Sequence, residues 1–429
     1  MKFFKLRATV AAASLLAAGG HAFAQAATDI PVDPTLEKQI TQVVKKVTDA
    51  TGLEFTGYLR TGFYSSANGQ AKGQYQLGGS LSHYRLGNEG DNYFEVMIGK
   101  NWDLGGGVKW GVHWMPNFYN GTTGTPQIYS DIKGLSFAPN VSFWAGQRFH
   151  RIQDIHVIDQ WLMGDGDSYG AGADGIDVGF GKLNLAVYSD GNTGNSTVSE
   201  NNARRANFQW RDLPVNPGGK LTLTGGVVNG TFAQGSNGGA LGLLHNQADF
   251  IVPGMTNSFF LQGSTGHADI DGKMYNLNTA PGVSAPGAKQ ARVIESINWQ
   301  SGLFGGQALV GYQTLKPDNG VTTKDVSLGG RVSYGVAKNV KLLGELGLTQ
   351  RKIDGQDKQN LTKGTFAVAF SPNTDFWTRP EFRIYVTRAN WNDAAQSAAA
   401  ASVAAGGAAS ALFGRTKATT IGAQVEAWW

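Results

Sequence analysis

Alternation of apolar and polar residues with a period of two dominates the chain from Leu53 onward. Within residues 182–190, the apolar side chains of one face belong to Leu183, Leu185 and Val187. The same alternation recurs over 325–334 and 381–387, and the alternating segments are separated by stretches rich in Gly, Asn, Asp and Thr. Because successive side chains of a strand point to opposite faces, the pattern predicts many short antiparallel strands.

The last alternating segment, residues 419–429, indicates the kind of sheet. It places Ile421, Val425 and Trp429 on one face and Gln424 and Glu426 on the other. A terminal aromatic on an apolar strand face is typical of a membrane barrel at its lipid interface, whereas such a strip in water would invite aggregation. Residues 53–429 can supply well over a dozen strands of about 9 to 11 residues. We therefore predict an all-β, transmembrane antiparallel β-barrel in contact with outer-membrane lipid.

The region before residue 53 has a different pattern. Three cations, an apolar stretch over 8–18 and the exit Ala22-Phe23-Ala24 predict a cleaved signal peptide, residues 1–24. In residues 25–52, apolar positions from Leu36 to Val47 follow spacings of four and three, which favours a periplasmic helical or short coiled-coil extension. A single amphipathic helix or a tether remains the alternative, since two heptads are marginal alone. The predicted barrel occupies residues 53–429.

The composition of the chain limits which kinds of partner we expect. The chain has 36 Lys plus Arg and 32 Asp plus Glu, and loss of the three signal-peptide cations leaves a balance near +1, so we expect no nucleic-acid partner. There is no cysteine to form disulfides. The 60 glycines and the 11% of aromatic residues suit strands joined by tight turns.

Motifs for catalysis or metal binding are weak. The seven histidines show no metal-ligand spacing, and none lies in a recognisable serine-nucleophile motif. The segment 164–167, Gly-Asp-Gly-Asp, lacks the later ligands of a calcium loop and is interpreted as a turn. The Ala-rich stretch 394–411 is interpreted as a large surface loop. We predict no enzyme activity, no metal and no cofactor.

Several longer segments resemble the maltoporin family, which includes the sucrose porins. The first alternating segment, 53–62, is similar to the family's first strand, and 84–89 is similar to its second. Further similarity lies in 144–149, 154–159, 170–172, 176–183, 377–380 and 422–429. The resemblance implies an 18-stranded barrel with an inward-folded constriction loop, the third of its loops. It also implies a homotrimer in the outer membrane of a Gram-negative bacterium and facilitated diffusion of maltose, maltodextrins or related oligosaccharides.

Four rings match the aromatic path along which this family's sugars slide: Tyr58, Tyr93, Trp377 and Trp428. By strand parity each shares a face with charged residues, so all four are expected to face the lumen. An interfacial girdle of Tyr and Trp is the alternative. Two further path positions stay open. Phe259 or Phe260 could fill one, and Trp114, Phe118 or Tyr119 the other.

The residues matching the family's polar track are Arg60, Arg85 and Glu95 on strands and Asp154 and Asp159 in the third loop. Opposite charges at a constriction offer many donors and acceptors for sugar hydroxyls. Plain solvated lumen lining is the alternative.

Two departures from the family's pattern concern the constriction itself. Trp161 replaces the usual tyrosine, and Ile152 replaces an arginine, with Arg151 next to it. We expect Trp161 and Arg151 to shape the narrowest part.

Other functions remain open at this point. A porin for another small solute would keep the barrel and bind no sugar. A barrel enzyme would need a nucleophile and base on one strand face, and an adhesin would have a plugged lumen. Conductance measurements distinguish these classes.

Overall fold

The computed structural model describes residues 51–66, 74–190, 202–232, 235–271, 274–275, 289–317, 320–405 and 411–429. The predicted signal peptide and all but the last two residues of the predicted N-terminal extension lie outside this range. Among the described residues, no helix is both long and apolar enough to cross a membrane.

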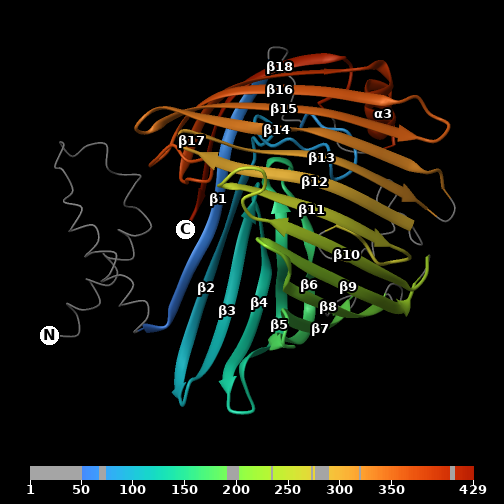
Figure 1. Cartoon of the computed structure of the whole chain (residues 1–429). Coiled ribbons are helices and arrows are strands. Elements are labelled where there is room, and N and C mark those ends of the chain that lie inside the picture. The colour runs from blue at the N-terminus through green and yellow to red at the C-terminus, as the bar shows by residue number, and fades with distance from the viewer. Residues whose placement is uncertain are drawn as a thin grey trace.

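Eighteen antiparallel strands form a closed barrel (Figure 1). Each strand pairs with its neighbours in sequence, and β1 closes the barrel by pairing with both β2 and β18. The strands are β1 (Leu53–Ser66), β2 (Asn92–Gly105), β3 (Val108–Tyr119), β4 (Thr122–Leu135), β5 (Ala138–Ile155), β6 (Gln160–Asp177), β7 (Lys182–Asp190), β8 (Asn202–Asn216), β9 (Gly219–Thr231), β10 (Gly238–Gln247), β11 (Met255–Ser264), β12 (Lys289–Ser301), β13 (Phe304–Lys316), β14 (Thr323–Ala337), β15 (Val340–Ile353), β16 (Gln359–Phe370), β17 (Glu381–Trp391) and β18 (Lys417–Trp428). The predicted 18-stranded barrel is confirmed.

The predicted period of two appears as alternating burial along the strands. In β17, Arg383 and Thr387 are buried inside, whereas Phe382, Ile384 and Val386 are exposed outside. Polar side chains therefore line the interior, and apolar ones form the outer surface. Closure gives each strand two partners, which lets backbone donors and acceptors pair within the sheet, as a bilayer requires.

The two ends of the barrel differ in their connections. At one end the connections include the long segments 67–91, 265–288 and 392–416. At the other end most are tight turns, such as 106–107, 302–303 and 338–339, and the chain terminates there after β18. We call these the long-loop end and the short-turn end. In membrane barrels of bacteria the long loops are extracellular and the short turns periplasmic.

Two segments fold into the lumen. Loop 1 is the connection between β1 and β2, of which residues 74–91 are described. Loop 3 is the tip of the β5–β6 hairpin, residues 152–163, and includes the short 3-10 helix η1 (His156–Ile158). A backbone hydrogen bond of 3.0 Å from Arg85 to Val157 joins the two loops. Together with the inner wall they form an apolar cluster consisting of Leu81, Tyr84, Ile155, Val157, Ile158, Leu162, Met163, Leu244, Phe260, Ile294, Leu309 and Phe376.

Loop 1 is fixed to the far wall by hydrogen bonds to its backbone. The amide of Leu86 donates to Glu345 Oε1 over 2.9 Å, and its carbonyl accepts from Thr365 Oγ1 over 2.9 Å and from the Lys363 ammonium. Gly87 adopts φ +78°, in the left-handed region, so the chain turns at the wall. The prediction that 84–89 forms the second strand was therefore wrong, and Arg85 lies in loop 1 rather than on a strand. β2 begins at Asn92.

Two other local predictions need correction. The Ala-rich stretch lies in a long connection, 392–416, as expected, but part of it forms helix α3 (Asp393–Ala404), whose first turn is capped by the Asn392 side chain accepting from the Ala395 amide over 3.2 Å. Alanine has the highest helix propensity, and Ala395 and Ala399 pack against a buried cluster that gives the helix a support. Residues 164–167 lie within strand β6 rather than in a turn, because the β5–β6 hairpin continues its pairing that far.

Candidate functional site

Three tyrosines follow one another along the inner wall. The ring centroids of Tyr58 on β1 and Tyr93 on β2 are 5.9 Å apart, and Tyr93 lies 6.2 Å from Tyr119 on β3. The Arg60 guanidinium is 5.6 Å from the centre of the Tyr93 ring. The three rings thus form a continuous line running towards the long-loop end.

The line continues towards the short-turn end through Trp428 and Trp377. Trp428 is paired with Tyr58 in the β1–β18 register, and the Arg379 guanidinium is 4.4 Å from the centre of its ring. Trp377 is not on a strand but in the connection 371–380. His156 of η1 contacts both tryptophans, with centroid distances of 5.8 Å to Trp428 and 5.3 Å to Trp377. We refer to Tyr119, Tyr93, Tyr58, Trp428, His156 and Trp377 as the ring path.

The ends of the ring path remain accessible. Tyr119 is 46% exposed, Trp377 38% and Trp428 36%, although these residues belong to the interior of the barrel. Aromatic faces that reach the solvent inside a lumen can stack against the apolar face of a solute.

The structure decides between the residues left open for the two further path positions. Trp114 pairs with Ile98 and Phe118 with Phe94, on the outer face of the sheet, whereas Tyr119 contacts Tyr93 inside. Tyr119 shares the inner parity of His113 and Asn117 on β3, so strand parity could have identified it. Of the other pair, Phe260 is inside but fully buried in the apolar cluster, so it presents no face to a solute.

An ionic cluster lies beside the ring path. Arg60 donates to Asp91 over 2.9 and 2.8 Å, to Glu89 over 3.0 Å and to Asp159 over 2.9 Å. The Asp159 carboxylate belongs to loop 3, Glu89 and Asp91 belong to loop 1, and Arg60 is on β1. This single guanidinium therefore links both inward loops to the wall.

Arg85 extends the ionic cluster towards β18. Its guanidinium contacts Glu89 at 2.7 Å and Glu426 at 2.9 Å, and it donates to the Tyr58 hydroxyl over 2.6 Å. Glu426 also accepts from Tyr58 Oη over 2.9 Å and from Arg379 over 2.8 Å. Glu89 and Glu426 are completely buried, so their charges are compensated within the cluster rather than by water.

The cluster sets the charge states of two loop residues. Burial alone would raise the pKa of Glu89, but the Arg85 and Arg60 guanidiniums hold it well below its usual range. Burial, with the nearby Arg85 charge second, lowers the pKa of His156 to about 4. Near neutral pH the site therefore contains an ionised Glu89 and an uncharged His156.

The remaining predicted polar residues lie on the β2 wall and in the hairpin. Glu95 accepts a hydrogen bond of 2.5 Å from the Tyr93 hydroxyl. Asp154 is opposite Trp161 in the β5–β6 register. The Arg151 guanidinium stacks on Phe149 at 3.8 Å and lies 5.1 Å from the centre of the Trp161 ring.

Ile152 shows what fills the position of the family's arginine. Its side chain packs on the apolar cluster of the lumen. The charge next to it, on Arg151, lies against aromatic rings instead.

The sequence did not single out Glu89, Glu426 or His156 as site residues, yet they connect the ring path to the ionic cluster. Glu426 could have been found, because it shares the inner parity with Trp428 on β18. Glu89 and His156 could not, since they belong to loops whose position depends on distant parts of the chain.

The family model of the LamB porin matches residues 53–429. Solved structures similar to the chain include an anion-selective porin from Comamonas acidovorans, at 11% identity and TM-score 0.45, covering 88% of this chain and 100% of that one. OpdQ from Pseudomonas aeruginosa has 9% identity and TM-score 0.47, and OccAB2 from Acinetobacter baumannii 10% and 0.47, each covering 88% of this chain and 98% of the other. The match over the whole barrel shows that the chain belongs to the LamB porin family and is an outer-membrane porin, a channel rather than an enzyme.

Proposed function

We propose that this porin conducts maltose, maltodextrins or related oligosaccharides by facilitated diffusion along the ring path, and that it does so as a homotrimer. The observation that carries the proposal is the series of rings from Tyr119 to Trp377, which consists of two contacting groups joined by the register pairing of Tyr58 with Trp428, with the ionic cluster along its side. The resemblance to maltoporins agrees with it.

The physical basis is the two-sided chemistry of a pyranose. One face of the ring is apolar and stacks on an aromatic side chain, whereas the hydroxyls at its rim lose water and need new partners. The carboxylates of Asp159 and Asp91 and the guanidinium of Arg60 lie within the same constriction as Tyr93. A sugar that exchanges hydrogen bonds along such a cluster is bound only weakly at each position, so it can enter and leave the pore.

The test is single-channel recording in a planar bilayer with maltotriose, maltohexaose and sucrose. We expect saturable block of the current by at least one of these sugars. Trp377→Ala and Trp428→Ala should weaken the block, because each removes an exposed stacking face, by roughly 2- to 13-fold for a loss of about 0.5–1.5 kcal/mol.

The matched control is Trp210→Ala, since Trp210 shares the outer parity of Phe208 on β8 and is absent from the ring path. An open channel that none of the three sugars blocks would leave a porin for another small solute. Equal loss of block in the control and in the two path variants would also contradict the assignment of the ring path.

A further inference from the structure

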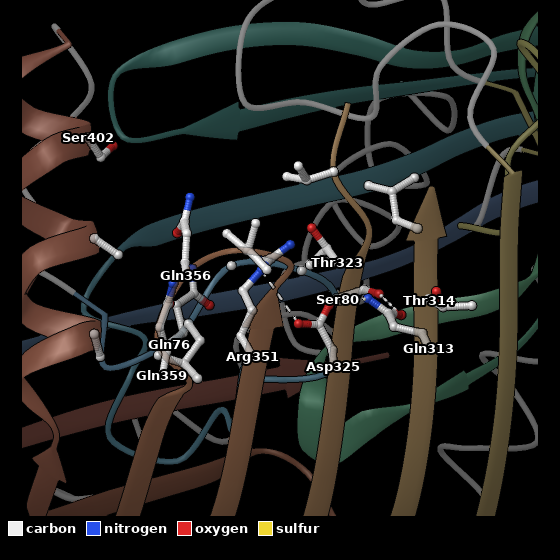
Figure 2. A pocket seen from close by; sticks show the side chains of 18 of the residues that line it. Gln76, Ser80, Gln313, Thr314, Thr323, Asp325, Arg351, Gln356, Gln359 and Ser402 are labelled. Atoms are coloured by element: carbon white, nitrogen blue, oxygen red, sulfur yellow. Dashed lines mark hydrogen bonds and ion pairs between the residues drawn. The ribbon is translucent and has the colours of Figure 1, made fainter. Parts of the chain in front are cut away.

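A second cavity opens at the long-loop end, away from the ring path. Its volume is about 700 Å³, within the range of small-molecule sites. Its walls are the ends of β13, β14 and β15 together with loop 1 and helix α3 (Figure 2). None of the ring-path residues is among those lining it.

The centre of this cavity is an incompletely satisfied ion pair. Asp325 and Arg351 face each other in the β14–β15 register, and Arg351 Nε is 3.5 Å from Asp325 Oδ1 (Figure 2). Within the described part of the chain, this is the sole polar contact of Arg351, and Asp325 Oδ1 has no hydrogen bond. Asp325 is only 6% exposed. A buried carboxylate and a guanidinium with spare hydrogen-bonding capacity, both bordering a cavity, are groups that a ligand could satisfy.

The second carboxylate oxygen of Asp325 is held in place by hydrogen bonds. Its Oδ2 accepts from Gln313 Nε2 over 2.9 Å, and Gln313 Oε1 in turn accepts from the Ser80 hydroxyl over 3.0 Å. Ser80 accepts from Arg292 over 3.1 Å. This chain of hydrogen bonds crosses from β12 through loop 1 to β14, so loop 1 fixes the orientation of the Asp325 carboxylate.

The lining indicates a neutral, hydroxyl-rich ligand. Amides and hydroxyls line the same cavity, among them those of Gln76, Gln359, Thr314 and Ser402. The remaining lining charge, Asp271, is already paired with Arg292. Two adjacent sugar hydroxyls fit the pair, since one can donate to Asp325 while the other accepts from Arg351. The described lining contains no aromatic ring, so recognition here would use hydroxyl edges instead of stacking.

We propose that this cavity is a saccharide-binding site at the mouth of the pore, separate from the ring path, in which Asp325 and Arg351 hold neighbouring hydroxyls of one sugar residue. The choice of a sugar as ligand rests partly on the proposed function. The site is built on loop 1, the same segment that supplies Arg85 and Glu89 to the constriction. A sugar bound here therefore lies next to the segment that leads to the ring path.

The chain has no cysteine, so an introduced thiol is a unique probe. In Ser402→Cys, the thiol lies on the cavity side of α3, and maltotriose should slow its reaction with a small thiosulfonate reagent. With the sugar at ten times its dissociation constant, occupancy slows the reaction about tenfold. The matched control is Ser397→Cys, an exposed position of the same helix that does not line the cavity and should react at an unchanged rate.

Two sets of further substitutions, each added to Ser402→Cys, distinguish binding at this site from binding at the ring path. Adding Arg351→Gln to Ser402→Cys should abolish protection, whereas adding Trp377→Ala and Trp428→Ala should preserve it. Recording the open-channel current of each variant verifies that it forms a pore.

The outcomes separate the two proposals. Block of the current by maltotriose without protection of Cys at position 402, or equal protection at 397 and 402, would overturn the mouth site and leave the proposed transport intact. Protection without block would support the mouth site while refuting sugar transport along the ring path. Absence of both would refute both.

Discussion

His156 lies where the ring path meets the ionic cluster. Arg85 donates to its Nδ1 over 2.9 Å, and Arg379 approaches its Nε2 at 3.4 Å. Two guanidiniums directed at one imidazole disfavour a further positive charge, in agreement with the pKa near 4. The residue therefore serves the pore as a neutral ring and as a hydrogen-bond acceptor.

This charge state predicts that His156 takes up a proton in the folded channel only near pH 4. Because the native pKa of His156 is below the unfolded value of about 6.5, its contribution to loop stability is complete above about pH 6.5 and is lost as the pH falls towards 4. In the folded channel, however, few His156 rings are protonated until the pH approaches 4. The decline in open-channel current and sugar block that His156 causes, measured in planar bilayers by comparison with His156→Gln, should therefore be absent at pH 7.5 and 5.5 and appear near pH 4.

The control for this prediction is His156→Gln, which retains an acceptor and cannot titrate. Its decline near pH 4 should be smaller than that of the wild type. A difference between the two channels with a midpoint close to 6.5 would contradict the neutral, buried His156.

Loop 1 shows, at the scale of an element, how glycine makes room for an inward segment. The Tyr84 ring lies against Gly347 on β15, where any Cβ would overlap it, and its hydroxyl hydrogen-bonds to Ser327 Oγ over 2.9 Å. Glycine at this position on the inner face of the wall therefore leaves the space that the Tyr84 ring of loop 1 occupies.

Gly347→Ala should displace Tyr84 and loosen loop 1. Overpacking of this kind costs about 1–3 kcal/mol. We expect a larger single-channel conductance and weaker sugar block, since the constriction widens. Gly364→Ala on the adjacent β16 is the matched control, because a Cβ there meets nothing within 4 Å. Unchanged conductance in a folded Gly347→Ala barrel would show that loop 1 does not limit the bore.

The sequence did not predict the inward path of loop 1 or helix α3, and the reasons differ. Strand alternation is a local property, so the barrel and the inner faces of β1, β17 and β18 could be predicted from neighbouring residues. Loop 1 depends on Glu345 and Lys363, which follow it by more than 250 positions. Helix α3 was missed for a different reason, since the Asn392 cap and the alanine run were present but were interpreted only as low complexity.

The candidate site divides in the same way. Tyr58, Tyr93 and Trp428 follow from strand parity and the family resemblance. Tyr119 also has the inner parity of β3 and could have been predicted, whereas the contacts of His156 depend on how loop 3 folds into the lumen. Side chains on strands could be predicted, whereas those on inward loops required the tertiary structure.

At the scale of the whole molecule, the chain is expected to work as a trimer. Native mass spectrometry of the purified porin in detergent should show particles carrying three chains, and current recordings should show closure in three equal steps. If the particle carries a single chain and sugar still blocks its current, the transport proposal is retained and the homotrimer is excluded.

The attachment of loop 1 also has a consequence for biogenesis. The loop is synthesised before nearly all of the barrel, yet its anchors on β15 and β16 belong to the final quarter of the polypeptide. Contacts so distant in sequence form late, after the intervening chain has been ordered. A nascent barrel must therefore pass through a stage in which the peptide bond after Arg85 is accessible to trypsin. Protection of this bond from cleavage would mark the completion of assembly.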